Sequence, residues 1–254
     1  MNELKQETSL ESFLGKMVTV IVDRPVGTIH PKYDNIIYPI NYGHIDGVIA
    51  SDGEAQDVYI LGINKPVKEF FGRVIAIIHR HNGTEDKLVV APEGMKYNQA
   101  EIMEQVYFQE QFFAISITCL YHKSCGAIIY RKIDGNIQYL LLFQHNSQTW
   151  SCPKGHAEAY ESELQAASRE VKEETGLDVR FISGFRETIT YPISDKCEKE
   201  VVLFLAEATN DIYLPEKEIQ KYMWVDKQNA IKLLARKAYA DIFDKIERIL
   251  KVSG

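Results

Sequence analysis

One stretch between Gly155 and Leu177 constrains this chain more than any other, because nine of its residues stand at fixed spacing. It reads GHAEAYESELQAASREVKEETGL: a glycine, five residues, Glu161, seven residues, and then Arg-Glu-Val-x-Glu-Glu-x-Gly-Leu. Small and apolar residues recur in it at i, i+3, i+4 and i+7. This period predicts a helix with one buried stripe, formed by Leu164, Ala167, Ser168 and Val171. Gly176 suits the position that ends such a helix.

On this helix three carboxylates fall on one side: Glu170, Glu173 and Glu174. Carboxylates at such short distances repel one another unless a cation lies among them. Hard oxygen ligands of this kind suit Mg²⁺. Arg169 precedes Glu173 by four residues and is expected to orient it by a charge-assisted hydrogen bond. The backbone carbonyl of Gly155 can approach a metal because no Cβ stands in the way. The alternative is a solvated acidic helix face, and the complete spacing favours the metal site.

Length and charge limit the class of protein. A chain of 254 residues exceeds the usual size of one domain, so two domains are expected. The net charge of −7 argues against non-specific DNA binding, which requires a basic surface. The sequence shows no apolar run near the length of a membrane span and no signal peptide. Its four cysteines are scattered, which favours reduced thiols and a cytoplasmic location.

The hydrophobic pattern predicts a different architecture for each half. The first half shows short β-branched runs followed by one helix, which predicts a small OB-like β-barrel with a packed helix: strands at 17–23, 57–63, 73–80 and 87–92 and a helix at 98–113. The second half predicts an α/β/α sandwich, with strands at 124–131, 138–144, 179–191, 199–208 and 222–225 and a final amphipathic helix at 227–250. We expect domains at 1–115 and 116–254.

The fixed spacing is the Nudix box, and from Ser124 onward the chain resembles the asymmetrical dinucleoside-tetraphosphate hydrolases of that family. The segments that carry the resemblance are SCGAIIYR, WSCPKGH before the box, GFRETITY, KEVVLFLAE and EIQKYMW. The resemblance implies a metal held by the Gly155 carbonyl, Glu170, Glu173 and Glu174. It implies Glu218 as a further catalytic carboxylate. It implies substrate contacts from the side chains Lys154, His156, Tyr191 and Lys199.

The implied activity is Mg²⁺-dependent hydrolysis of dinucleoside polyphosphates, with Mn²⁺ as the alternative ion. Diadenosine tetraphosphate would give ATP and AMP, with Glu174 or Glu218 as the base. Tyr191 matches an aromatic residue that stacks on adenine, and the family's second stacking residue aligns with Arg236, close to Tyr239. Three other functions stay open: hydrolysis of a nucleotide sugar, nucleoside triphosphate or RNA 5′ end; a second, pyrophosphatase activity; and a nucleotide sensor without turnover.

Residues 15–113 resemble the family I inorganic pyrophosphatases, which have an OB-type barrel. YPINYG at 38–43, DGEAQD at 52–57, KYD at 32–34 and EDK at 85–87 carry the resemblance. It implies a second metal and phosphate site formed by Asp23, Lys32, Asp52, Glu54, Asp57 and Lys87.

The match to the pyrophosphatases departs at several positions. Phe112 and Phe113 replace a Tyr-Lys phosphate clamp, a metal aspartate falls near Arg80, and the segment with a family arginine is missing between Asp34 and Tyr38. The departures predict a first domain with weak pyrophosphatase activity, or one that only binds a metal or an anion.

Overall fold

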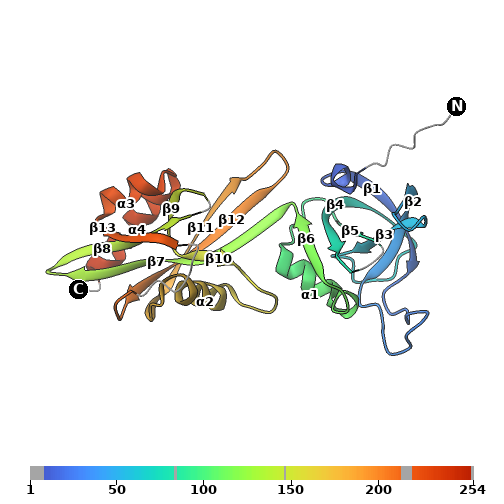
Figure 1. Cartoon of the computed structure of the whole chain (residues 1–254), viewed down its shortest axis with the longest axis horizontal. Helices are drawn as coiled ribbons and strands as arrows, with labels where there is room; N and C mark the ends of the chain where they lie inside the picture. The colour runs from blue at the N-terminus through green and yellow to red at the C-terminus, as the bar shows by residue number, and fades with distance from the viewer. Residues whose placement is uncertain (1–8, 83–84, 146, 213–218, 253–254) are drawn as a thin grey trace. The chain divides into compact units, whose positions relative to one another are not determined.

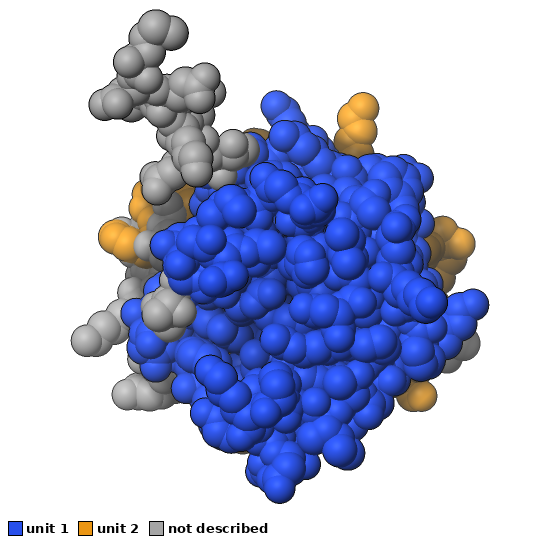
Figure 2. All heavy atoms as spheres, turned by 90° about the vertical axis from the view of Figure 1, so that its right-hand side faces the viewer, with its two compact units in different colours: residues 1–122, 192–198 blue, residues 123–191, 199–254 orange. Residues whose placement is uncertain are grey.

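The computed structural model describes residues 9–82, 85–145, 147–212 and 219–252. The chain forms two compact units, which Figure 2 shows in different colours. Unit 1 consists of residues 1–122 and 192–198, and unit 2 consists of residues 123–191 and 199–254. The predicted domain boundary between residues 115 and 116 remains a prediction. Among the described helices, none combines the length and the apolar character needed to cross a bilayer.

Unit 1 contains a closed barrel of five strands (Figure 1), namely β1 (Met17–Arg24), β2 (Asn41–Ile49), β3 (Ala55–Ile60), β4 (Glu69–Arg80) and β5 (Lys87–Ala91). The barrel closes because β1 pairs with both β2 and β4, in the order β1-β2-β3-β5-β4. β3 and β5 are parallel, and the other barrel pairs are antiparallel. β6 (Ile115–Cys119) adds to β4, and a 3-10 helix (Leu10–Phe13) precedes β1. The architecture agrees with the predicted OB-like barrel.

Alternating side chains on the barrel strands form two cores. Val58 and Ile60 of β3 belong to one core, and Tyr59 between them belongs to the other. β5 alternates in the same way. The second core is completed by helix α1 (Gln99–Glu110), which buries Ile102 and Val106. A capping box at Asn98 starts this helix, close to its predicted position.

Strand β2 was absent from the sequence-based prediction. Its sequence NYGHIDGVI contains two glycines and an aspartate, which are poor strand formers. Gly43 has a packing reason, because a Cβ at this position would lie 1.9 Å from the backbone oxygen of Ile21 on the paired strand β1. The close approach of two backbones therefore decides the residue here, and periodicity gives no sign of it.

Unit 2 is built on a sheet in the order β11-β12-β7-β8-β13. Its strands are β7 (Tyr121–Ile133), β8 (Asn136–Gln144), β11 (Val179–Pro192), β12 (Glu198–Ala208) and β13 (Ile219–Val225). Two short strands join its inner members: β9 (Thr149–Ser151) pairs with β8, and β10 (Lys154–His156) pairs with β7. The predicted strands of this half are confirmed, with β7 extending further at both ends.

Helices cover both faces of this sheet (Figure 1), as the sandwich prediction requires. Ile128 and Tyr130 of β7 pack with α3 (Lys227–Leu234) and α4 (Ala238–Val252). Ala127 and Ile129 of the same strand belong to a core with Val171 of α2 (Glu163–Thr175). The alternation of one strand thus divides the interior into two layers.

Helix α2 confirms the predicted helix and its end at Gly176, which has φ 68°. The predicted buried stripe was partly wrong. Ala166, Ala167, Val171 and Thr175 are buried, whereas Leu164 is 44% exposed and Ser168 is exposed. The stripe is rotated because the face that meets the sheet must be formed by small side chains that allow close packing.

The single helix predicted at 227–250 was also wrong. The chain ends α3 at Ala235, which adopts a left-handed conformation with φ 56°, and starts α4 at Ala238. Both helices bury residues in the same core, including Leu234 from α3 and Phe243 from α4. The break lets two short helices cover one sheet face, and this burial outweighs the cost of about 1–2 kcal/mol for a left-handed residue.

Candidate active site

The centre of the site is the contact between β10 and α2. Gly155 lies on β10, and a Cβ there would come within 2.1 Å of a carboxylate oxygen of Glu170. Only glycine therefore allows this carboxylate to lie against the strand. The Glu170 side chain is 13% exposed, and burial raises its pKa against the opposing effect of Arg169. A carboxylate held this way retains its affinity for a cation.

Arg169 holds three acidic side chains together. Its guanidinium binds both oxygens of Glu161 at 2.8 and 2.9 Å, and its Nη1 donates to Glu170 at 2.8 Å and to Glu173 at 3.0 Å. Its Nη2 also donates to the backbone carbonyl of His156 at 2.9 Å. The expected bond to Glu173 is confirmed. Arg169 thus ties α2 to β10 and brings two carboxylates to one nitrogen.

Glu174 lies on the inner side of the cluster. One of its oxygens accepts a hydrogen bond from the backbone N–H of Lys154 at 2.9 Å, and the other accepts from the Gln144 amide at 3.2 Å. Burial raises the pKa of Glu174 to about 7, against the opposing effect of these two donors. A carboxyl group with this pKa exchanges a proton near neutral pH, which is the property a general base requires.

Gln144 is a site residue that the sequence did not reveal. It lies 30 positions before Glu174, at the end of β8, and its contact depends on the pairing of strands. Glu161 belonged to the box pattern without an assigned role, and the structure places it on Arg169. The predicted carboxylate Glu218 lies outside the described residues, so its role remains a prediction.

Two lysines lie near these carboxylates without an acidic partner of their own in the described part of the chain: Lys154 on β10 and Lys199 on β12. Burial lowers the pKa of Lys199, and the nearby charge of Lys154 acts in the same direction, while Glu170 opposes it. Cations that repel each other at the edge of a carboxylate cluster are suited to an anionic ligand. The side chain of His156 is exposed, on the third residue of β10.

Tyr191, the predicted base-stacking residue, lies at the end of β11 and already carries a stacked group. The guanidinium carbon of Arg236 is 3.5 Å from the centroid of its ring. Tyr239 is 5% exposed and packs in the core, so it is not available for stacking. The left-handed turn at Ala235 places Arg236 between α3 and α4, where the chain is free of helical constraints.

The acidic side chains of α2 suit a divalent metal by two observations. The Glu170 carboxylate occupies space that a side chain at residue 155 would fill, and residue 155 is glycine. Glu170 and Glu173 both accept from Nη1 of Arg169, so their hard oxygens lie close together. In the described ranges, no three acidic, histidine or cysteine side chains already surround a common point. Metal binding would therefore draw Glu173 away from Arg169, and Glu173 is free to move because it is 49% exposed.

The barrel residues predicted to form a second site are arranged differently. Asp57 of β3 accepts from Lys87 Nζ at 2.5 Å and from the hydroxyl of Tyr42, and Lys87 also contacts Glu85 at 2.6 Å. Burial raises the pKa of Glu85, and Lys87 opposes the shift. Asp57 and Lys87 thus lie close together, and they form an ion pair with each other.

The other predicted barrel ligands do not join them. Asp52 and Glu54 are exposed in the turn before β3, where Asp52 accepts from the backbone N–H of Glu54. Asp23 lies 3.9 Å from His44, and Lys32 is exposed in the loop after β1. As on α2, no three acidic, histidine or cysteine side chains surround a common point among the described residues, and a metal or phosphate site in the barrel stays a prediction.

Arg80 takes part in a second ion pair inside unit 1. Its guanidinium pairs with Glu110 of α1, whose side chain is fully buried, and its Nε donates to Glu110 at 2.8 Å. The buried Tyr59 hydroxyl donates to the same carboxylate, and the Arg80 guanidinium lies 4.0 Å from the ring centroid of Phe113. Arg80 and Phe113, which carry two of the three departures noted in the sequence, thus belong to one cluster.

Comparison with known proteins supports the reading of the second half. The family profile described as the NUDIX domain matches residues 120–246. The chain is 38% identical over 123 residues to an asymmetrical bis(5′-nucleosyl)-tetraphosphatase of Sus scrofa, covering 44% of this chain and 83% of that protein. The corresponding protein of Caenorhabditis elegans is 37% identical over 117 residues, with the same coverage of both chains.

A solved structure of the C. elegans Ap4A hydrolase in a binary complex is 32% identical, covers 51% of this chain and 98% of its own, and superposes with a TM-score of 0.48. The residues matched by the profile include helix α2 with its carboxylate cluster. The chain belongs to the Nudix family, and it is a Nudix pyrophosphohydrolase similar to the asymmetrical bis(5′-nucleosyl)-tetraphosphatases.

Proposed function

We propose that this enzyme hydrolyses dinucleoside polyphosphates with Mg²⁺ and splits diadenosine tetraphosphate into ATP and AMP. The observation that carries the proposal is the position of two lysines beside the carboxylates of α2. Lys154 lies on β10, where its backbone N–H donates to Glu174 at 2.9 Å, and the charge of Glu170 acts on Lys199. A tetraphosphate bridge is heavily anionic. It needs a cation cluster on its oxygens, which the carboxylates would recruit and the lysines would supplement.

The chain's own residues would divide the work as follows. Glu170, Glu173 and the Gly155 carbonyl would hold Mg²⁺, which neutralises phosphate oxygens when bound. Glu174 would accept a proton from the attacking water, since its pKa of about 7 allows it to do so at neutral pH. Arg169 would keep Glu170 oriented against β10, and Glu218 remains a second proposed carboxylate.

Tyr191 would bind one adenine. The Arg236 guanidinium occupies stacking distance on its ring, so a base on that face would replace it. We therefore expect Tyr191→Ala to raise KM more than it lowers kcat, since stacking contributes about 1–3 kcal/mol of binding. Arg236→Ala is expected to lower KM for the same substrate. Equal KM values in both variants and the unaltered enzyme would refute this placement of the base.

The main proposal is tested by identifying the products of hydrolysis and the product that carries ¹⁸O from the solvent. In ¹⁸O-water with Mg²⁺, diadenosine tetraphosphate should yield ATP and AMP, because attack is expected away from the centre of the bridge. Two ADP molecules as the main product would contradict it. A panel with ADP-ribose, a nucleoside triphosphate and a capped RNA 5′ end separates the alternative substrates. Binding of a nucleotide without any turnover would favour the sensor.

For the first half, we propose an OB-type barrel that resembles family I inorganic pyrophosphatases and hydrolyses pyrophosphate poorly. Asp57 is paired with Lys87, and Arg80 with Glu110, so the charges that would meet pyrophosphate already meet each other. Loss of one prepared contact to a transition state costs about 10²–10³ in rate.

Orthophosphate release from pyrophosphate by the full chain, with Asp57→Asn as control, measures this activity. Vigorous hydrolysis abolished by Asp57→Asn would make the enzyme bifunctional.

A further inference from the structure

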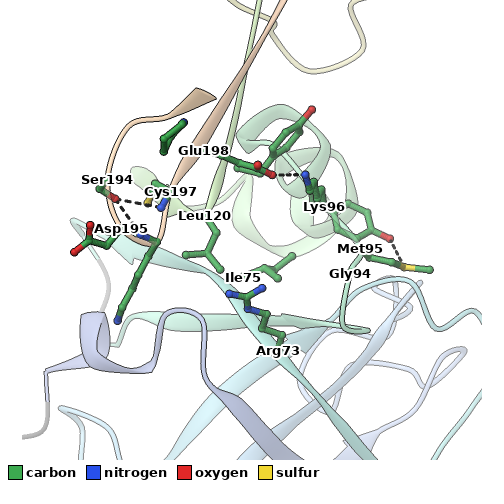
Figure 3. A pocket seen from close by; sticks show the side chains of 14 residues that line it. Arg73, Ile75, Gly94, Met95, Lys96, Leu120, Ser194, Asp195, Cys197 and Glu198 are labelled. Atoms are coloured by element: carbon green, nitrogen blue, oxygen red, sulfur yellow. Dashed lines mark hydrogen bonds and ion pairs between the residues drawn. The ribbon is translucent and has the colours of Figure 1, made fainter. Parts of the chain in front are cut away.

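Unit 1 has a partly open cavity of about 400 Å³ that is separate from the carboxylate cluster (Figure 3). Its wall comes from four segments: β4, the loop at 94–97, the link between β6 and β7, and the turn at 192–198 between β11 and β12. A cavity of this size lies within the range of about 300–1,000 Å³ that is typical of small-molecule sites.

Arg73 of β4 supplies the main charge. Its Nε donates to the backbone carbonyl of Gly15 at 3.2 Å, which fixes the plane of the guanidinium. Its two terminal nitrogens have no acceptor among the residues that the structure describes. Figure 3 shows this guanidinium among the side chains that line the cavity. A fixed guanidinium with unused donors is suited to a planar or tetrahedral oxyanion.

The turn at 192–198 adds further donors. Ser194 Oγ accepts from the backbone N–H groups of Lys196 at 3.4 Å and Cys197 at 3.1 Å, so its own proton remains available to a ligand. The Lys196 side chain is exposed and has no acidic partner in the described ranges. The turn is held in place because the Glu198 N–H donates to the Leu120 carbonyl at 3.0 Å.

The charge balance of the wall favours an anion. Three cations, Arg73, Lys96 and Lys196, stand against two acids, Asp195 and Glu198. Lys96 and Glu198 neutralise each other in an ion pair, and Figure 3 shows the Asp195 carboxylate on the far side from Arg73. The cavity is therefore locally positive in a chain whose net charge is −7. Such a local sign concentrates anionic ligands.

The rest of the wall can hold an organic group. Ile75, Leu120 and Met95 supply apolar surface, and Tyr97 and Tyr121 supply aromatic rings. The apolar and aromatic side chains can contact a flat organic group, while the fixed guanidinium can bind a charged group on the same ligand. Inorganic phosphate alone would leave the larger part of the cavity unused.

We propose that this cavity binds a phosphate monoester of nucleotide size, with its phosphate at Arg73 and Lys196 and its organic part against the apolar and aromatic wall. The site is independent of the carboxylate cluster, because its lining residues belong entirely to unit 1.

The test uses the full chain with Lys154→Gln and Lys199→Gln, so that phosphate binding at the cluster in unit 2 is suppressed. Titration calorimetry in the presence of EDTA compares AMP, adenosine and inorganic phosphate. We expect saturable binding of one AMP, weaker binding of phosphate and no binding of adenosine. No saturable binding of AMP at millimolar concentration would overturn the proposal, and phosphate as tight as AMP would overturn its organic half.

Three further variants in this background locate the site. Arg73→Gln should weaken AMP binding about 10- to 100-fold, which corresponds to the loss of charge-assisted hydrogen bonds. Lys196→Gln should weaken it a few-fold, and its exposed position keeps the test valid should Arg73→Gln lower the melting temperature. Lys68→Gln, an exposed lysine outside the cavity, is the matched control. Unchanged AMP affinity in both Arg73→Gln and Lys196→Gln would refute the assignment.

Discussion

The acidic clusters of the two units differ in how much positive charge their own neighbours provide. In unit 2 the carboxylates of Glu161, just before α2, and of Glu170 and Glu173 on α2 share the single guanidinium of Arg169. Among the described residues, no cationic side chain is bonded to Glu174. In the barrel, Glu110 has Arg80 to itself, and Asp57 and Glu85 share Lys87. The first cluster keeps the larger excess of negative charge, with four carboxylates around one guanidinium against three carboxylates and two cations in the barrel.

That difference teaches what separates a reactive site from a structural one. An excess of carboxylates at the surface recruits a divalent cation, whereas a matched and buried pair stabilises only if it remains complete. The Tyr42 hydroxyl also donates a hydrogen bond to Asp57, which restricts the position of this carboxylate. Burial and the charge of Asp57 raise the pKa of Tyr42. Residue types alone do not distinguish the two clusters, but their partners do.

The largest effect should come from breaking the barrel pair. Arg80→Met leaves the fully buried Glu110 carboxylate without its partner, so we expect a loss of about 3–5 kcal/mol in the free energy of unfolding. The double variant with Glu110→Gln should recover a large part of this loss. Urea unfolding of the three proteins measures it, and a loss below about 1 kcal/mol in Arg80→Met would show that the pair is solvated.

The next effect concerns rate. Glu173→Gln or Glu174→Gln should lower kcat at least about 10²-fold, because each removes a metal ligand or the base. The stability change should stay within roughly 1 kcal/mol, since Glu173 in particular is exposed. Steady-state hydrolysis of diadenosine tetraphosphate tests this, with the exposed Glu93→Gln as control. Near-normal kcat in both variants would move the reaction away from α2.

A smaller effect is expected from the two lysines. Lys154→Gln and Lys199→Gln should each raise KM about tenfold, the equivalent of one charge-assisted contact to phosphate. Lys232→Gln, an exposed lysine on α3, should leave KM unchanged. If KM stays constant in the first two variants, the lysines serve the fold and not the substrate.

The smallest effect is a pH dependence of stability in unit 2. Hydrogen bonds from Arg186 and Lys123 lower the pKa of Glu163 from its ordinary 4.5 to about 2. A lowered pKa in the folded state means that the stabilisation is present above pH 4.5 and is lost as the pH falls toward 2. Glu163→Gln should cost about 1 kcal/mol at pH 7 and progressively less as the pH falls through about 2. The free energy of unfolding is measured for both proteins as a function of pH. A difference between Glu163→Gln and the unaltered protein that does not change with pH would refute this.

Local patterns in the sequence were sufficient for most of the helices and strands and for the local arrangement of charged residues in the box. The helix over the box, its end at Gly176 and the bond from Arg169 to Glu173 depend on residues within a few positions of one another, so spacing predicts them. The barrel strands other than β2 follow from β-branched runs. Glu218 remains a prediction, as does the metal itself.

What the sequence could not determine are contacts between distant segments. The rotated stripe of α2, the break at Ala235 and the Gln144 contact to Glu174 all depend on which faces meet in the packed unit. The pairing of Arg80 with Glu110 likewise joins a strand to a helix 30 residues away. The sequence by itself determined which residues carry charge and most of the helices and strands. Only the tertiary structure decided which charges neutralise one another, because neutralisation depends on distance in space and on burial.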